Sequence, residues 1–139
     1  MALLEVSNLK KIYASRLGGT RVQALTNVSF SAQEGEYVAI MGESGSGKTT
    51  LLNIIAAFDK PTEGDVLLDG RSLSTVRDKD ISAFRRDHLG FVFQEFNLLD
   101  TFTVQDNIFL PLVLAGKKYP EMRERIVPLA TKLGIFDIL

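Results

Sequence analysis

The chain contains no cysteine and only one histidine in 139 residues. The absence of cysteine excludes disulfides and thiolate metal sites, and it is compatible with a reducing cytosol. An excess of either charge is also lacking, because 16 Lys and Arg residues face 17 Asp and Glu residues, a formal net charge of −1. A chain without a basic surplus carries no electrostatic footprint for nucleic acid, so we expect no nucleic acid partner.

Long hydrophobic runs are missing as well. The longest, IFLPLVLAG at residues 108–116, is too short to cross a bilayer. The first residues, MALLEVSNLKK, lack the basic start and apolar centre of a secretory signal. We therefore expect no direct membrane insertion, and any association with a membrane would go through a partner. No repeat or linker divides the sequence, so its length predicts one domain.

The hydrophobic pattern alternates between strand and helix periods, which predicts a mixed α/β fold. Strand patterns occupy residues 3–9, 24–30, 36–41, 65–69 and 90–94, and helical patterns occupy residues 51–58, 78–88, a stretch from 103 and 119–133. The nearly continuous apolar runs at 37–41 and 90–94 predict strands covered on both faces. Asp69 and Gly70 predict a hairpin turn.

The two C-terminal helices have clear end signals. Thr103 can cap the first turn of one helix while Asp106 reaches back, and Gly134 is a C-terminal cap for the other. Pro111 and Pro128 lie inside these patterns, and each is expected to kink or split its helix. The residues expected to point inward from the last helix are Met122, Ile126, Leu129, Ala130 and Leu133.

The stretch GESGSGKTT, residues 42–50, matches the phosphate-binding pattern G-x-x-x-x-G-K-[ST] in full. Glycines let successive backbone N–H groups turn toward one point, and the helix that follows adds its free amides and positive dipole end. Lys48 supplies an ammonium for the outer phosphates, and the Thr49 hydroxyl can ligate Mg²⁺. The predicted contacts to ATP are Gly42, Glu43, Ser44, Gly45, Ser46, Gly47, Lys48, Thr49 and Thr50.

Neighbouring segments favour one family of phosphate-binding proteins. LKKIYASR at residues 9–16, the segment 34–70 around the loop, and RRDHLGFVFQEFNLLDTFTVQDNIFLPL at 85–112 resemble the ATP-binding subunit of ABC transporters. The resemblance covers nearly the whole chain and keeps the family's order. Residues 88–108 look most like bacterial exporters that sense or remove antimicrobial peptides such as bacitracin, with macrolide-export and lipoprotein-release subunits next.

The resemblance implies roles for two further residues. Tyr13 would be the aromatic ring on which the adenine stacks, and Gln94 would meet Mg²⁺ and the attacking water. Residues 95–107 would form the segment that touches the membrane subunit. The resemblance thus gives Lys48 and Gln94 as catalytic residues and Thr49 and Gln94 as Mg²⁺ ligands.

Several parts of the family's active site are missing from these 139 residues: the Leu-Ser-Gly-Gly-Gln segment, the apolar strand ending in Asp-Glu, and a later histidine. Asp69 does not supply the missing Asp-Glu pair, because Gly70 follows it and the two residues fit a turn. His88 does not supply the missing histidine, because it precedes the Gln94 segment, and it is expected to pack at a helix end. We expect residues 1–139 to be the N-terminal portion of one P-loop domain of the ABC type, unable to turn over ATP alone.

In the full-length protein the resemblance implies an ATPase at the cytoplasmic face of the cell membrane. Two copies would sandwich two ATP–Mg²⁺ and drive a membrane-spanning permease subunit. The residues leave open a nucleotide-binding or regulatory module without turnover. A GTPase or nucleotide kinase is disfavoured, because the chain has no Asn-Lys-x-Asp base reader and its arginines precede the strand pattern ending at Gln94 instead of forming a lid.

Overall fold

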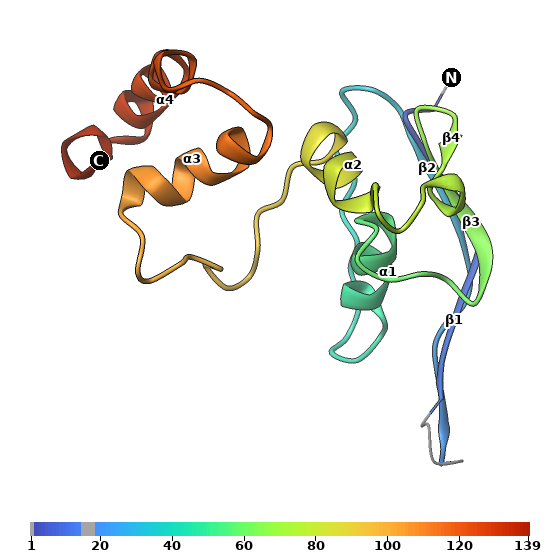
Figure 1. Cartoon of the computed structure of the whole chain (residues 1–139). Helices are drawn as coiled ribbons and strands as arrows, with labels where there is room; N and C mark the ends of the chain where they lie inside the picture. Colours follow the sequence, from blue (N-terminus) through green and yellow to red (C-terminus); the bar gives the residue numbers. More distant parts are fainter. Residues whose placement is uncertain (1, 15–18) are drawn as a thin grey trace. The chain divides into compact units, whose positions relative to one another are not determined.

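The computed structural model describes residues 2–14 and 19–139; Ser15 and Arg16 of the LKKIYASR segment lie outside the described residues. The elements along the chain are β1 (Leu4–Ala14), β2 (Arg21–Ala32), α1 (Lys48–Ile55), β3 (Glu63–Leu68), β4 (Arg71–Ser72), the 3₁₀ turn η1 (Leu73–Thr75), α2 (Ile81–His88), α3 (Val104–Leu114), α4 (Tyr119–Leu133) and the 3₁₀ turn η2 (Phe136–Ile138). They form two compact units, Met1–Leu89 and Gly90–Leu139 (Figure 1).

The first unit is built on a four-stranded antiparallel sheet in the order β2-β1-β3-β4. β3 and β4 form the hairpin that the sequence predicts, because Asp69 (φ 50°) and Gly70 (φ 72°) both have positive φ, as the two-residue hairpin turn requires. The register of β1 against β3 shifts between Ser7 and Lys10. Gly64 of β3 lies against this irregularity, so the two backbones come unusually close there.

Helix α1 packs on this sheet because its apolar stripe matches the apolar residues of the strands (Figure 1). The buried cluster consists of Val6 and Leu9 of β1, Leu25 of β2, Leu51 and Ile54 of α1, and Val66 of β3. Leu9 and Ile54 are almost completely buried. This cluster fixes α1, and therefore the loop that precedes it, against the strands.

The second unit contains α3, α4 and η2. Thr103 and Asp106 form the predicted capping box at the start of α3, and Gly134 (φ 69°) ends α4 in the left-handed conformation, as predicted. Phe109 of α3 packs among Met122, Ile126 and Ala130 of α4. None of the helices in the described ranges is both apolar and long enough to cross a bilayer.

Two predicted strands are wrong. Residues 37–41 and 90–94 form no strand, and their apolar side chains include some of the most exposed in the described chain: Tyr37 is 93% exposed and Val92 103%. A strand exists only where a neighbour takes up its backbone N–H and C=O groups. Within the described ranges neither segment pairs with another strand, so an apolar pattern alone does not produce one.

Three helical details also differ from the prediction. Pro111 and Pro128 do not split α3 and α4: each helix continues through its proline, and both prolines lie at exposed positions. Leu129 (60% exposed) and Leu133 (71% exposed) do not point inward, because the apolar stripe of α4 is wider than the surface that covers it. The helix predicted over residues 78–88 begins only at Ile81, after a turn.

Candidate functional site

The loop at residues 42–50 runs directly into α1, as the pattern predicts. Gly47 is the N-cap of α1 with φ 96°, a left-handed conformation that favours glycine. A Cβ at Gly47 would lie 2.5 Å from the carbonyl oxygen of Ala24 and 3.0 Å from Cδ2 of Leu25. Space and backbone conformation therefore both require glycine here. Gly45 (φ 81°) shares the left-handed region, which gives the loop the sharp turns of an anion-binding nest.

The start of α1 offers its own backbone to an anion. The first amides of any α-helix have no partner within the helix, and at α1 no side chain caps them among the described residues. The N-terminal end also carries the positive end of the helix dipole. A phosphate placed at this end would accept hydrogen bonds from these amides.

Lys48 folds back over the loop. Its ammonium donates to the carbonyl oxygens of Gly42 at 2.7 Å and Glu43 at 2.6 Å, and it lies 3.3 Å from Oγ of Ser46. A Cβ at Gly42 would lie 2.6 Å from that same Ser46 oxygen, so the Ser46 side chain would have to move to admit one. The loop thus holds the positive charge of Lys48 at its own carbonyl groups, just ahead of α1 in the chain.

Thr49 follows Lys48 in the first turn of α1, and its side chain is exposed. Mg²⁺ bound with nucleotides takes one or two protein oxygens and completes its shell with phosphate oxygens and water. An exposed hydroxyl next to the phosphate loop fits that ligand set. No group of three or more His, Asp and Glu residues that could hold a metal ion is present in the described ranges.

Tyr13, the predicted adenine platform, lies near the end of β1 and is 43% exposed. Its hydroxyl donates to Oδ2 of Asp59 at 2.8 Å, and the Lys11 ammonium lies 4.8 Å from the centre of its ring. Asp59 follows the C-terminal end of α1, where its Oδ1 accepts from Lys11 at 2.7 Å and from the Lys60 backbone N–H at 2.7 Å. The ring is therefore held from two sides.

The Asp59 carboxylate is kept charged by these contacts. Burial raises the pKa of Asp59, but the hydrogen bonds from Lys11, Tyr13 and the Lys60 backbone outweigh that effect and hold the pKa below its ordinary value. A lowered pKa means that this cluster stabilises the fold at pH values above the carboxyl's unfolded pKa, and that the stabilisation is lost as the pH falls through the folded pKa. At neutral pH the carboxylate is ionised.

Gln94 belongs to the second unit and is exposed, in a segment without regular structure. The structure therefore brings the phosphate loop, Thr49 and Tyr13 into one unit and leaves Gln94 in the other. His88 packs at the end of α2, as predicted, with its ring centre 4.6 Å from that of Phe84.

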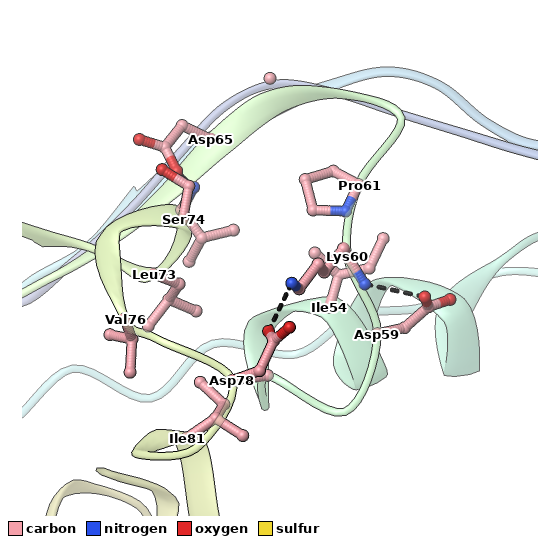
Figure 2. A pocket seen from close by; sticks show the side chains of 13 residues that line it. Ile54, Asp59, Lys60, Pro61, Asp65, Leu73, Ser74, Val76, Asp78 and Ile81 are labelled. Carbon is pink, nitrogen blue, oxygen red and sulfur yellow. Dashed lines mark hydrogen bonds and ion pairs between the residues drawn. The ribbon is translucent and has the colours of Figure 1, made fainter.

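A cavity of about 230 Å³ lies between α1, β3, η1 and α2, and Asp59 and Lys60 are among the residues that line it (Figure 2). Its apolar wall includes Ile54, Pro61, Val66, Leu73, Val76 and Ile81. The charged groups at its rim bind other groups of the chain: the Lys60 ammonium reaches Asp78 at 2.6 Å, and Asp65 accepts from the Ser72 hydroxyl at 2.8 Å. A ligand site needs convergent polar groups directed at the ligand, and these rim groups are already engaged in hydrogen bonds or an ion pair within the chain.

The sheet with a phosphate loop leading into α1 defines this chain as part of an ATP-binding cassette domain. A family model described as ABC transporter matches residues 25–139, and the chain belongs to the ABC transporter family. The uncharacterized ABC transporter ATP-binding protein YvcR of Bacillus subtilis is 50% identical over 139 residues, which cover 100% of this chain and 54% of YvcR.

Two further comparisons bear on fold and function. The bacitracin export ATP-binding protein BceA of Halalkalibacterium halodurans is 42% identical over 138 residues, 99% of this chain and 54% of BceA. A solved structure shows the ATP-binding cassette MJ0796 as a dimer in a post-hydrolysis state, bound to ADP and Pi. It superposes on this chain with a TM-score of 0.79 at 42% identity, and the match covers 88% of this chain and 53% of the MJ0796 chain. The chain spans about half the length of the curated relatives it matches.

The contacts of Lys11 and Asp59 with Tyr13 were not predicted from the sequence. Lys11 lies two residues from Tyr13 on β1, so both side chains point to the same face, and this spacing was a usable signal. Asp59 is 46 residues away from Tyr13, and no local pattern connects the two.

Proposed function

We propose that this chain binds ATP–Mg²⁺ at residues 42–50, as the N-terminal portion of the nucleotide-binding domain that powers an ABC transporter. Lys48 binds the outer phosphates, Thr49 ligates Mg²⁺, and Tyr13 stacks on the adenine. In the longer protein Gln94 meets the metal and the attacking water. MJ0796, at 42% identity, is bound to ADP and Pi, which supports a nucleotide as the ligand.

One observation carries this proposal: glycine is required at position 47 by backbone and by space, and Lys48, the next residue, folds over the loop. A flexible surface turn would need neither feature. Both features support a phosphate-binding loop, because helix N-terminal amides and a nearby ammonium are groups that bind the phosphates of a nucleotide.

Binding of Mg-ATP is expected to stabilise the chain. At a concentration one hundred times the dissociation constant, a ligand that binds only the folded state adds about 2.7 kcal/mol to the free energy of unfolding. Thermal unfolding followed with increasing Mg-ATP would show a rising midpoint, whereas adenosine at the same concentrations, which lacks phosphates, should leave the midpoint nearly unchanged. A midpoint that does not respond to Mg-ATP would contradict the proposal.

Residues 1–139 alone are expected to bind ATP without hydrolysing it. Phosphoryl transfer to water requires an oriented nucleophile as well as a phosphate grip, and the 139 residues contain no Asp-Glu pair at the end of an apolar strand. Phosphate release by the purified chain should equal that of its Lys48→Ala variant. Release that exceeds this control, and disappears with Lys48, would show that the chain holds a complete site.

Family membership also supports a proposal for the partner and the location. We propose that the full-length protein pairs with a second copy and with a permease subunit at the cytoplasmic face of the membrane, in an exporter of the bacitracin, macrolide or lipoprotein type. The identity with BceA supports the bacitracin type. In the segment 95–107, Phe96 is 90% exposed and Leu98 62%, and Asn107 holds the loop through hydrogen bonds to the Leu99 backbone. An ordered loop with exposed apolar side chains suits contact with a permease.

A further inference from the structure

The ring of Tyr13 is held in a fixed orientation. Its hydroxyl donates to one oxygen of Asp59, and the other oxygen of that carboxylate accepts from Lys11. Lys11 also donates to the Lys60 backbone carbonyl at 2.6 Å, so its ammonium is tied to the chain that follows α1. The Lys11 side chain is only 12% exposed and that of Asp59 31%, which keeps both groups in place.

The cluster joins the end of α1 to the strand that carries Tyr13. The Thr62 hydroxyl accepts from the Ile12 backbone N–H at 3.0 Å, and the Thr62 backbone N–H donates to the Lys10 carbonyl at 2.8 Å. The chain at residues 59–62 therefore runs along the last part of β1. Since α1 begins at the phosphate loop, its rigid backbone connects the loop at one end with the anchor of the Tyr13 ring at the other.

The ammonium of Lys11 also decides which face of the ring is available. It lies over the Tyr13 ring at 4.8 Å from the centre, within the range of a cation–π contact. An aromatic ring has two faces for stacking, and this contact occupies one of them. Tyr13 is 43% exposed, so part of the residue remains open to a ligand, and a base that stacks on the ring would have to use the face that Lys11 does not cover.

We propose that Asp59 and Lys11 are positioning residues for the adenine: they hold the Tyr13 ring so that a single open face meets the base of the bound nucleotide. The inference rests on the proposed function. Asp59 fixes the ring through the hydroxyl, and Lys11 covers the face turned away from the base. Neither residue touches the nucleotide.

The test compares two ligands that share their phosphates and differ in the base, Mg-ATP and Mg-tripolyphosphate, by calorimetry on the whole chain. Tyr13→Ala should weaken Mg-ATP binding about 5- to 150-fold, the range found for loss of one stacked base. Tyr13→Phe, which removes only the hydroxyl, and Asp59→Ala should each weaken it about 3- to 10-fold, the effect of one hydrogen bond. Binding of tripolyphosphate should be unchanged in all three variants.

Asp78→Ala is the matched control, because Asp78 is also an aspartate paired with a lysine, but its exposed ion pair is with the Lys60 ammonium, whereas only the Lys60 backbone contacts Asp59 and Lys11. It should leave binding of both ligands unchanged. In a Tyr13→Ala background, Asp59→Ala should cause no further loss of Mg-ATP affinity, because the residue acts only through the ring.

The outcomes separate the inference from the proposed function. The positioning role is supported if Asp59→Ala and Tyr13→Phe lower the affinity for Mg-ATP but not for tripolyphosphate, and if Asp59→Ala causes no further loss in the Tyr13→Ala background. If Asp59→Ala and Tyr13→Phe leave Mg-ATP affinity intact while Tyr13→Ala lowers it, the inference is overturned and the adenine platform stands. An equal loss for tripolyphosphate also overturns it, because a distorted fold explains that result. A wild-type chain that binds neither ligand overturns the proposed function itself.

Discussion

Replacing Lys48 with alanine is expected to weaken Mg-ATP binding about 10- to 150-fold. Hydrogen bonds that involve a charged partner contribute about 1.5–3 kcal/mol, and each 1.4 kcal/mol is a factor of ten in affinity. In the structure the ammonium donates to the carbonyls of Gly42 and Glu43, close to where the outer phosphates would lie. Isothermal titration calorimetry with Mg-ATP measures the change directly.

The matched control for this variant is Lys60→Ala. Lys60 lies in the same unit, and its side chain is 80% exposed in an ion pair with Asp78. Exposed pairs of this kind contribute little to stability, so the control should bind Mg-ATP like the wild type. Because Lys48 acts on phosphates, its loss should reduce tripolyphosphate affinity equally. An unchanged affinity after Lys48→Ala, or an equal loss after Lys60→Ala, would remove the phosphate role of Lys48.

Gly64→Ala is expected to lower the free energy of unfolding by about 2–5 kcal/mol. A left-handed conformation costs an L-residue about 1–2 kcal/mol, and overpacking adds about 1–3 kcal/mol. Gly64 has φ 86°, and a Cβ there would lie 2.4 Å from the carbonyl oxygen of Asn8 and 2.5 Å from that of Ser7. These are backbone atoms, so β1 and β3 would have to separate.

The loss at Gly64 can be separated from the general cost of positive φ by Gly35→Ala. Gly35 has φ 75°, but a Cβ there would have no atom within 4 Å. Its replacement should cost about 1–2 kcal/mol, the conformational part alone. Urea unfolding of both variants gives the two values. If Gly64→Ala were no more destabilising than Gly35→Ala, the close approach of β1 and β3 would not be a real constraint.

Sequence patterns identified those parts of the molecule whose structure is determined locally. The capping box of Thr103, the turn at Asp69 and Gly70, and the loop that ends at Gly47 depend on residues a few positions apart, and the structure has all three as predicted. The apolar stripe of α1 identified Leu51 and Ile54 correctly for the same reason.

The predictions that were wrong depend on parts of the chain far apart in sequence. The apolar run at residues 37–41 indicates a buried strand, but a strand also needs a hydrogen-bonding neighbour, and the run itself does not show whether one is present. Leu129 and Leu133 fit the inward face of α4, yet their burial depends on which surface packs there. The bond between Tyr13 and Asp59 joins residues 46 positions apart, and only a folded chain brings them together.

Gly47 at the N-cap of α1 leaves the first amides of the helix available to a ligand, at the expense of some helix stability. Serine or aspartate at an ordinary N-cap bonds the first amides and stabilises the helix by about a few tenths of a kcal/mol relative to glycine, but the positive φ and the close Ala24 carbonyl exclude both residues at position 47. The N-terminus of a helix capped in that way has fewer free amides to donate to a bound anion. Because the first amides of α1 have no side-chain cap within the described part of the chain, the chain lacks a small contribution to its free energy of unfolding. A phosphate that accepts hydrogen bonds from these amides would supply that contribution. Without a ligand, the N-terminus of α1 should therefore be less stable than it is with a phosphate bound there.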